Sequence, residues 1–226
     1  MTSNDVIRRI GEVGIVPVVR AACVDDATRA VEAICAGGIP IVEITMTVPN
    51  ASDVIRQIVR EYGDQVLVGA GTVTTSEQAM LCLAVGAEFL VSPGLALPVI
   101  SAAHASGKLA IPGALTPSEL MSAQDAGARL IKIFPCGNVG GPRYLKALKG
   151  PFPDAALIPT GGVNLSNAAE FIAAGAFALG VGGELVDPVA LRKGDLGKIT
   201  QAASDLVRAV RLARESAKNT AAPASP

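Results

Sequence analysis

The sequence predicts one α/β domain, a (β/α)8 TIM barrel with an N-terminal helix, and three observations support this fold class. The chain has 226 residues, a length that suits a single large α/β domain. Short β-branched runs alternate with helical patterns of roughly 10–14 residues, as in repeated βα units around a parallel sheet. Eight such runs occur, and strict alternation favours a closed barrel. An open doubly wound sheet is the alternative, because periodicity alone does not show closure.

The predicted strands are runs rich in valine, isoleucine and leucine, bounded by glycine, proline or polar residues. In chain order they cover 15–20, 40–46, 65–71, 88–92, 108–113, 129–134, 156–161 and 177–182. The helices between them begin at residues that commonly cap helices, and several end at a glycine shortly before the next strand. The expected caps are Asp25, Asn50, Ser76, Thr116 and Asn164 to Ser166.

The two ends of the chain lie outside this alternation. Residues 1–14 have the pattern of a charged amphipathic helix and lack the apolar core of a signal peptide. The last helix is expected over 195–217. The domain is therefore predicted to span 1–217, and the small, polar residues 218–226 to form a disordered tail.

Composition excludes several classes of partner. The formal net charge is −1 and no long basic run occurs, so we expect no nucleic-acid partner. The chain has no tryptophan and two tyrosines, too few aromatic residues for base stacking. No apolar run approaches the roughly 18 uninterrupted residues of a membrane span. We therefore expect a small-molecule ligand and no membrane.

The four cysteines and the single histidine limit the chemistry. Scattered cysteines without a C-x-x-C motif indicate reduced thiols and a cytoplasmic protein. His104 alone cannot build a zinc site of several imidazoles. It is expected on a helix away from the strand ends, where it could not serve a Ser-His or Cys-His site. We therefore expect neither a metal nor a cofactor.

One lysine lies inside a predicted strand. The stretch ARLIKIFPCG, residues 128–137, places Lys132 between apolar neighbours. Burying a charged amine without a partner costs several kcal/mol, and loss of the proton avoids that cost. A neutral lysine amine is a nucleophile. Lys132 is therefore the first candidate for a catalytic residue.

Other polar residues fall at the carboxyl ends of the predicted strands, where barrel enzymes place their active sites. Side chains alternate between the two faces of a strand, so Glu43 and Lys132 can both project into the interior. The same alternation places Arg20 at the end of the first strand and Thr72 at the end of the third, both at the mouth of the barrel. This predicts an amine, a carboxylate, a guanidinium and a hydroxyl around one mouth.

Each of these residues also has a plainer structural interpretation. Lys132 and Glu43 could form a buried ion pair that only stabilises the barrel. Arg20 could be an exposed charge at the start of a loop. Thr72 could cap the following helix.

A pair of glycines follows each of the last two predicted strands, in PTGGVN (159–164) and GVGGEL (180–185). The corresponding loops of barrels commonly bind phosphate. Glycine lets backbone N–H groups approach an anion closely. The alternative is a tight turn without a ligand.

These residues belong to motifs at nearly every predicted strand end, and together they resemble a known family. The chain is similar to class I aldolases that cleave 2-keto-3-deoxy-6-phosphogluconate (KDPG) and 4-hydroxy-2-oxoglutarate (KHG). The matching segments are 16–21, 37–51, 68–73, 91–94, 111–119, 131–142, 149–153, 159–164 and 180–186.

The resemblance implies a (β/α)8 barrel, a homotrimer and a Schiff-base mechanism. Lys132 falls on the Schiff-base lysine and Glu43 on the acid/base. Thr72 falls beside the pyruvate carboxylate and Phe134 beside the imine. The other expected substrate-binding residues lie in the matching segments and are Arg20, Pro93, Thr160, Gly161, Gly162, Gly182 and Gly183.

The sequence departs from the family pattern at two positions. Some members carry a carboxylate-binding arginine four residues after the glutamate, but Thr47 stands there. Members more similar to this chain end the first strand in arginine, so Arg20 would hold the carboxylate. Gly183 stands where a serine usually contacts phosphate, so one hydroxyl is lost.

The expected reaction is cleavage of KDPG to pyruvate and glyceraldehyde 3-phosphate, with KHG as a further substrate. One alternative is a phosphosugar isomerase or epimerase that uses Glu43 as a base without a covalent step. Another is a barrel without activity that binds an anionic metabolite through its glycine pairs.

Overall fold

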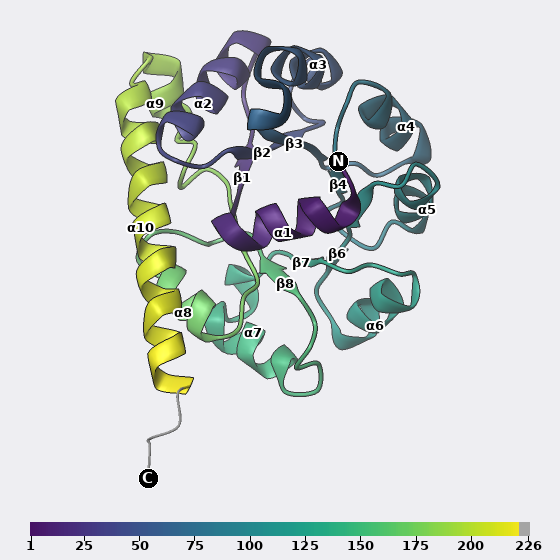
Figure 1. Ribbon diagram of the computed structural model, residues 1–226, viewed down its shortest axis with the longest axis vertical. Coiled ribbons are helices and arrows are strands. Elements are labelled where there is room, and N and C mark those ends of the chain that lie inside the picture. The colour runs from purple at the N-terminus through teal and green to yellow at the C-terminus, as the bar shows by residue number, and fades with distance from the viewer. Residues whose placement is uncertain (222–226) are drawn as a thin grey trace.

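Helices and short parallel strands alternate along residues 1–221, the part of the chain that this computed structural model describes (Figure 1). Every run predicted as a strand contains one. The strands are β1 Ile15–Val19, β2 Ile41–Thr45, β3 Leu67–Gly71, β4 Phe89–Val91, β5 Leu109–Ile111, β6 Gly113–Ala114, β7 Ile131–Ile133, β8 Leu157–Pro159 and β9 Leu179–Val181.

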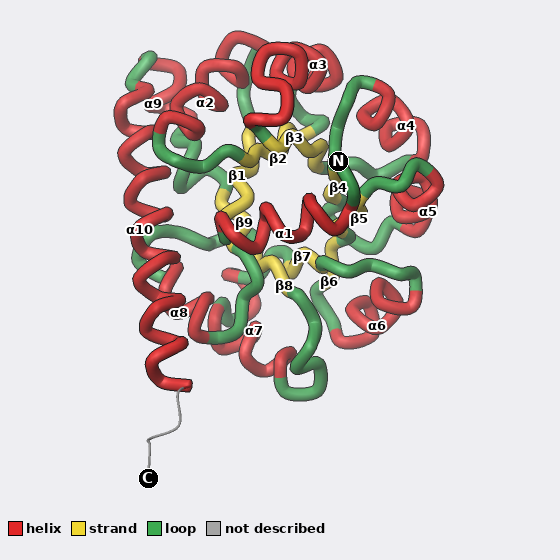
Figure 2. Tube along the Cα trace, in the orientation of Figure 1, coloured by secondary structure: helices red, strands yellow, loops and turns green. Residues whose placement is uncertain are grey.

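The helices other than α1 lie around the outside of the strands, and most of them connect one strand to the next (Figure 2). They are α1 Ser3–Val13, α2 Val24–Ala36, α3 Ala51–Tyr62, α4 Ser76–Ala84, α5 Leu97–Ala105, α6 Pro117–Asp125, α7 Pro142–Lys149, α8 Ala168–Ala173, α9 Pro188–Lys193 and α10 Leu196–Ala221, with 3-10 turns η1 Gly63–Gln65 and η2 Gly137–Val139. Thr116 caps α6 as expected, whereas the hydroxyl of Thr75, rather than that of Ser76, caps α4.

The strands form two parallel sheets. A curled six-stranded sheet has the order β5-β4-β3-β2-β1-β9, and a three-stranded sheet has the order β6-β7-β8. The fifth predicted strand, 108–113, is divided at Pro112 into β5, which pairs with β4, and β6, which pairs with β7. Between β8 and β9 lies a single bridge, Thr160 to Gly180. The strands of both sheets lie around a common centre in Figure 2.

Every strand is buried along its whole length, as expected of a parallel sheet whose faces are both covered. Aliphatic side chains of the strands and of the inner helix faces form one core cluster. This core fixes the strand ends, and with them the loops that follow β1, β2, β7, β8 and β9.

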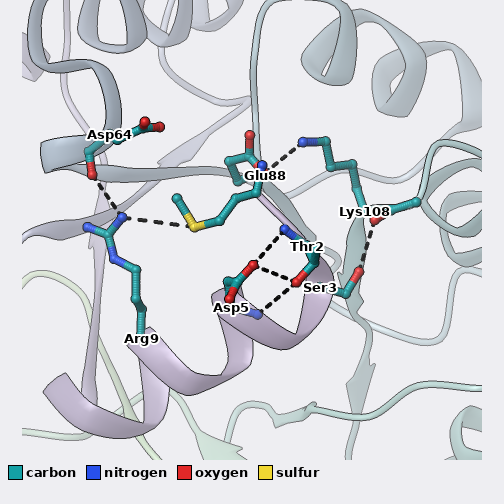
Figure 3. A network of polar contacts seen from close by, with 9 residues as sticks. Thr2, Ser3, Asp5, Arg9, Asp64, Glu88 and Lys108 are labelled. Atoms are coloured by element: carbon teal, nitrogen blue, oxygen red, sulfur yellow. Dashed lines mark hydrogen bonds and ion pairs between the residues drawn. The ribbon is translucent and has the colours of Figure 1, made fainter.

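Helix α1 crosses the amino ends of the strands, where the polar network of Figure 3 fastens it. The Arg9 guanidinium donates to the carbonyls of Asp64 and Gln65, at 2.9 and 3.0 Å, just before β3. The Ser3 hydroxyl donates to the Gly107 carbonyl at 3.0 Å, just before β5. The predicted N-terminal helix is confirmed, and it covers the strand end opposite the expected site.

The expected end of the last helix is corrected. Helix α10 runs through Ala221, so residues 218–221 are helical and do not belong to a disordered tail. Residues 222–226 lie outside the described part of the chain. None of the helices within residues 1–221 has the length and apolarity required to cross a membrane.

Candidate active site

Lys132 and Glu43 face each other inside the protein from opposite sheets. Lys132 is the middle residue of β7 and is 4% exposed, and Glu43 is the middle residue of β2 and is 2% exposed. Lys132 Nζ lies 4.0 Å from Glu43 Oε1 and 5.1 Å from the centre of the Phe134 ring. The alternation of side chains thus placed both residues correctly.

Gly71 makes room for the Glu43 carboxylate. Gly71 pairs with Thr45 across the β2–β3 ladder, and a Cβ added to it would overlap with Glu43 Oε1. A residue with a side chain at position 71 would therefore displace the carboxylate. Gly71, the second glycine of the GAG motif at 69–71, therefore has a steric role that the strand pattern does not predict.

The Glu43 carboxyl is poised to hold a proton. Burial raises the pKa of Glu43 above its ordinary value, and the charges of Lys132 and Arg20 offset that effect in part. Within residues 1–221, Oε1 of Glu43 is the buried side-chain oxygen without a hydrogen-bond partner. The 4.0 Å to Lys132 is too long for a hydrogen bond, so this oxygen is free to exchange a proton with a ligand.

A cavity of about 210 Å³ opens at the carboxyl ends of β1, β7, β8 and β9. Neither Lys132 nor Glu43 lines it, but Phe134 does, and the centre of its ring lies 5.1 Å from Lys132 Nζ. The cavity brings together most of the predicted substrate-binding residues. They are Arg20, Phe134, Thr160, Gly161, Gly162, Gly182 and Gly183. Three further lining residues, Val18, Val163 and Glu184, were not predicted. Val18 could have been found, since it shares a strand face with Arg20.

Arg20 is exposed at the end of β1, and its guanidinium extends towards β9. Its Nη1 lies 3.3 Å from the position that a Cβ on Gly182 would occupy. No carboxylate forms an ion pair with it among the described residues. The guanidinium is therefore available to an anion in the cavity.

The two glycine pairs present backbone donors to the same cavity. Gly161 and Gly162 have positive φ angles of 85° and 77°, a conformation that favours glycine. Among the loop and turn hydrogen bonds of the described chain, the N–H groups of Gly162, Gly183 and Glu184 donate to no backbone carbonyl. Unpaired N–H groups around a concavity suit an anion.

Thr72 and Pro93 lie outside this cavity. Thr72 is half-buried directly after β3 and has a positive φ of 56°, which is strained for a β-branched residue. Thr75, not Thr72, caps α4, so the capping interpretation of Thr72 was wrong. Pro93 lines a separate open groove with Thr74 and Leu95.

Comparison with known proteins places this site in context. A family model for KDPG and KHG aldolase matches residues 6–202. The 2-dehydro-3-deoxy-phosphogluconate aldolase of Dickeya dadantii is 38% identical over 193 residues, which are 85% of this chain and 90% of that relative.

Two solved structures are similar over most of the chain. A KDPG aldolase from Legionella pneumophila, with pyruvate captured at low pH as a covalent carbinolamine intermediate, matches with a TM-score of 0.83 and 32% identity, covering 88% of this chain and 97% of that one. A cube-shaped protein cage designed by fusing symmetric oligomeric domains matches with a TM-score of 0.85 and 32% identity, covering 92% and 76%.

The fold, the buried lysine and these relatives define the class of the protein as an aldolase, a carbon–carbon lyase that forms a Schiff base. The chain belongs to the KDPG and KHG aldolase family. Since these relatives are aldolases, the alternative interpretation as an isomerase or epimerase is not supported.

Proposed function

We propose that this protein cleaves KDPG to pyruvate and glyceraldehyde 3-phosphate, and KHG to pyruvate and glyoxylate, through a Schiff base on Lys132. The observation that carries the proposal is the buried pair of Lys132 and Glu43, 4.0 Å apart, whose lysine lies near Phe134 at the wall of an anion-accepting cavity. The names of the family and of the Dickeya relative supply the substrate class.

The first half of the reaction builds an electron sink. The amine of Lys132 adds to the C2 carbonyl of the keto acid and forms a carbinolamine. The Glu43 carboxyl gives its proton to the departing hydroxyl, which leaves as water. The product is a protonated imine, with Glu43 now a carboxylate. The raised pKa of Glu43 favours the proton-bearing form that this step requires.

The second half breaks the carbon–carbon bond. The Glu43 carboxylate takes the proton of the C4 hydroxyl, the C3–C4 electron pair moves into the imine, and the aldehyde leaves. The pyruvate enamine is then protonated at C3 by the same carboxyl. Water adds to the imine, and pyruvate and the free amine are released.

Binding is divided between the two ends of the substrate. Arg20 grips the C1 carboxylate, since a guanidinium can offer it two parallel hydrogen bonds. Thr72 and Pro93 follow β3 and β4 outside the cavity, and we assign them to the carboxylate end by the family resemblance alone. Phe134 lines the cavity and is proposed to pack beside the imine. Thr160 and the backbone N–H groups of the glycine loops receive the distal phosphate. These loops contain Gly161, Gly162, Gly182 and Gly183.

The two sheets are proposed to form one closed (β/α)8 barrel within a single domain that includes all of α10. Two observations support closure. Pro112 alone separates β5 from β6, and Thr160 bridges to Gly180 between β8 and β9. Proline has no N–H for a ladder, which accounts for the interruption at position 112.

A homotrimer is the proposed assembly. Large apolar side chains are exposed on the neighbouring helices α4, α5 and α6, at Met80, Leu81, Leu97 and Met121. Such patches suit an interface between subunits. The cage built from symmetric oligomeric domains is consistent with an oligomer. The four free cysteines support a cytoplasmic location.

A retro-aldol assay tests the proposal. Purified protein is supplied with KDPG or KHG, and pyruvate release is followed with a coupled lactate dehydrogenase. We expect release from both substrates, with kcat/KM reported for each. The proposal is contradicted if neither keto acid yields pyruvate.

A further inference from the structure

Two threonine hydroxyls are linked at the end of β2, two and four residues after Glu43. Thr45 is fully buried, and its Oγ1 lies 3.1 Å from the carbonyl oxygen of Val19. The same Oγ1 lies 2.7 Å from Oγ1 of Thr47, which is exposed. Val19 ends β1 and directly precedes Arg20. The pair therefore connects the strand of the acid/base to the strand end that carries the guanidinium.

The direction of both hydrogen bonds follows from the donors available. A carbonyl oxygen can only accept, so the single proton of Thr45 goes to Val19. Thr47 must then donate its own proton to Thr45 Oγ1. Neither hydroxyl keeps a proton for a ligand.

The contact to Val19 extends the pairing of β1 with β2. The backbone register joins Val18 to Glu43 and Val19 to Ile44, and Thr45 Oγ1 adds a side-chain link at the next residue. On the other side, the N–H of Met46 donates to the Gly71 carbonyl at 2.7 Å. The end of β2 is thus fixed between its neighbours, and it holds the point from which Arg20 emerges.

We propose that Thr45 is a positioning residue for Arg20, and that Thr47 takes no part in binding the substrate because its hydroxyl proton is engaged with Thr45. This inference rests on the proposed function, in which Arg20 binds the keto-acid carboxylate. It assigns the placement of the Arg20 guanidinium to the threonine that ends β2. Thr45 acts through the backbone of β1, to which its hydroxyl is bonded at Val19.

Pyruvate trapping on the full-length protein tests this assignment. Borohydride reduces the imine that pyruvate forms on Lys132, and the half-saturating pyruvate concentration reports how well the carboxylate is held. Thr45→Val keeps the side-chain shape but removes the hydroxyl. We expect the half-saturating pyruvate concentration to rise about five- to tenfold, as for loss of one well-placed hydrogen bond. The kcat of retro-aldol cleavage should stay within about twofold of that of the unmodified protein. Thr45→Ser should restore the half-saturating concentration.

A double-mutant cycle separates positioning from a general loss of stability. Arg20→Gln should raise the half-saturating concentration, and adding Thr45→Val to Arg20→Gln should raise it no further. An equal increase in both backgrounds would overturn the proposal. So would an unchanged pyruvate dependence in Thr45→Val.

Thr47→Val is a second variant for the pyruvate-trapping experiment. Thr47 is exposed, so this substitution does not disturb the core. We expect less than about a twofold change, because its proton is engaged with Thr45. A weakening as large as that of Arg20→Gln would identify Thr47 as a carboxylate ligand and overturn the inference. If the unmodified protein traps no pyruvate on Lys132, it is the proposed function that fails.

Discussion

The Glu43 carboxylate occupies the space that a side chain on Gly71 would need. A Cβ on Gly71 would overlap with Glu43 Oε1, which lies 4.0 Å from Lys132 Nζ. The position of the acid/base therefore depends on a glycine in the neighbouring strand as well as on its own strand.

Gly71→Ala tests this dependence. We expect kcat to fall about 100-fold, since displacing a catalytic group by roughly 1 Å costs that much, and stability to fall by about 1–3 kcal/mol through overpacking. Retro-aldol kinetics and urea unfolding measure the two effects. Gly94→Ala is the control, because no atom lies within 4 Å of the added Cβ. Normal kcat in Gly71→Ala would show that the carboxylate tolerates the displacement.

Glu43→Gln tests whether the Glu43 side chain transfers protons or only fills its place in the site. Glutamine fills the same volume but cannot carry the proton that the mechanism moves at three steps. We expect kcat to fall about 10²- to 10⁴-fold with little change in KM. Single-turnover cleavage of KDPG gives the chemical rate directly. A rate near that of the unmodified enzyme would remove Glu43 from the mechanism.

The pH dependence of stability follows from the raised pKa of Glu43. Above its ordinary pKa of 4.5 the unfolded chain loses this proton, while the folded protein retains it because the carboxyl is buried. The folded state then binds more protons, so the free energy of unfolding decreases as pH rises from 4.5 through the folded pKa.

Glu43→Gln should lack this contribution. We expect the stability of the variant relative to the unmodified protein to increase as pH rises above 4.5, as measured by urea unfolding at several pH values. Glu61→Gln, at an exposed position on α3, is the matched control. Parallel profiles for Glu43→Gln and the unmodified protein would contradict the assigned direction.

Gly183→Ser tests the distal end of the site. Position 183 has open space around an added Cβ and borders the same cavity as Arg20. A serine hydroxyl there should lower the KM for KDPG by about fivefold, as one added hydrogen bond to phosphate, and leave KHG unaffected. Gly94→Ser, outside this cavity, should change neither KM. An equal effect on both substrates would place the phosphate elsewhere.

Much of this arrangement could be predicted because strand geometry alone determines it. The alternation of facing within RLIKIF and PIVEITM placed Lys132 and Glu43 on interior faces, and burial of both agrees. The glycine pairs were placed correctly because each follows its strand directly. The βα alternation located every strand region, although the fifth predicted strand is divided into β5 and β6.

Features that depend on contacts between distant segments were missed. The split at Pro112 follows from pairing with two different neighbours, which the run KLAIPG does not reveal. Thr72 lies beyond the end of β3, where alternation no longer predicts direction, and it does not line the cavity. The Thr45 link to Val19 and the overlap at Gly71 join residues from neighbouring strands, and side-chain periodicity does not encode them.

Covalent capture of pyruvate tests the central claim most directly. The unmodified protein and Lys132→Ala are each incubated with pyruvate and sodium borohydride, digested and analysed by peptide mass mapping. The account predicts a stable mass increase on the peptide that contains Lys132, absent in Lys132→Ala, together with complete loss of retro-aldol turnover in that variant. An unmodified Lys132 peptide in an active enzyme, or turnover by Lys132→Ala, would contradict it.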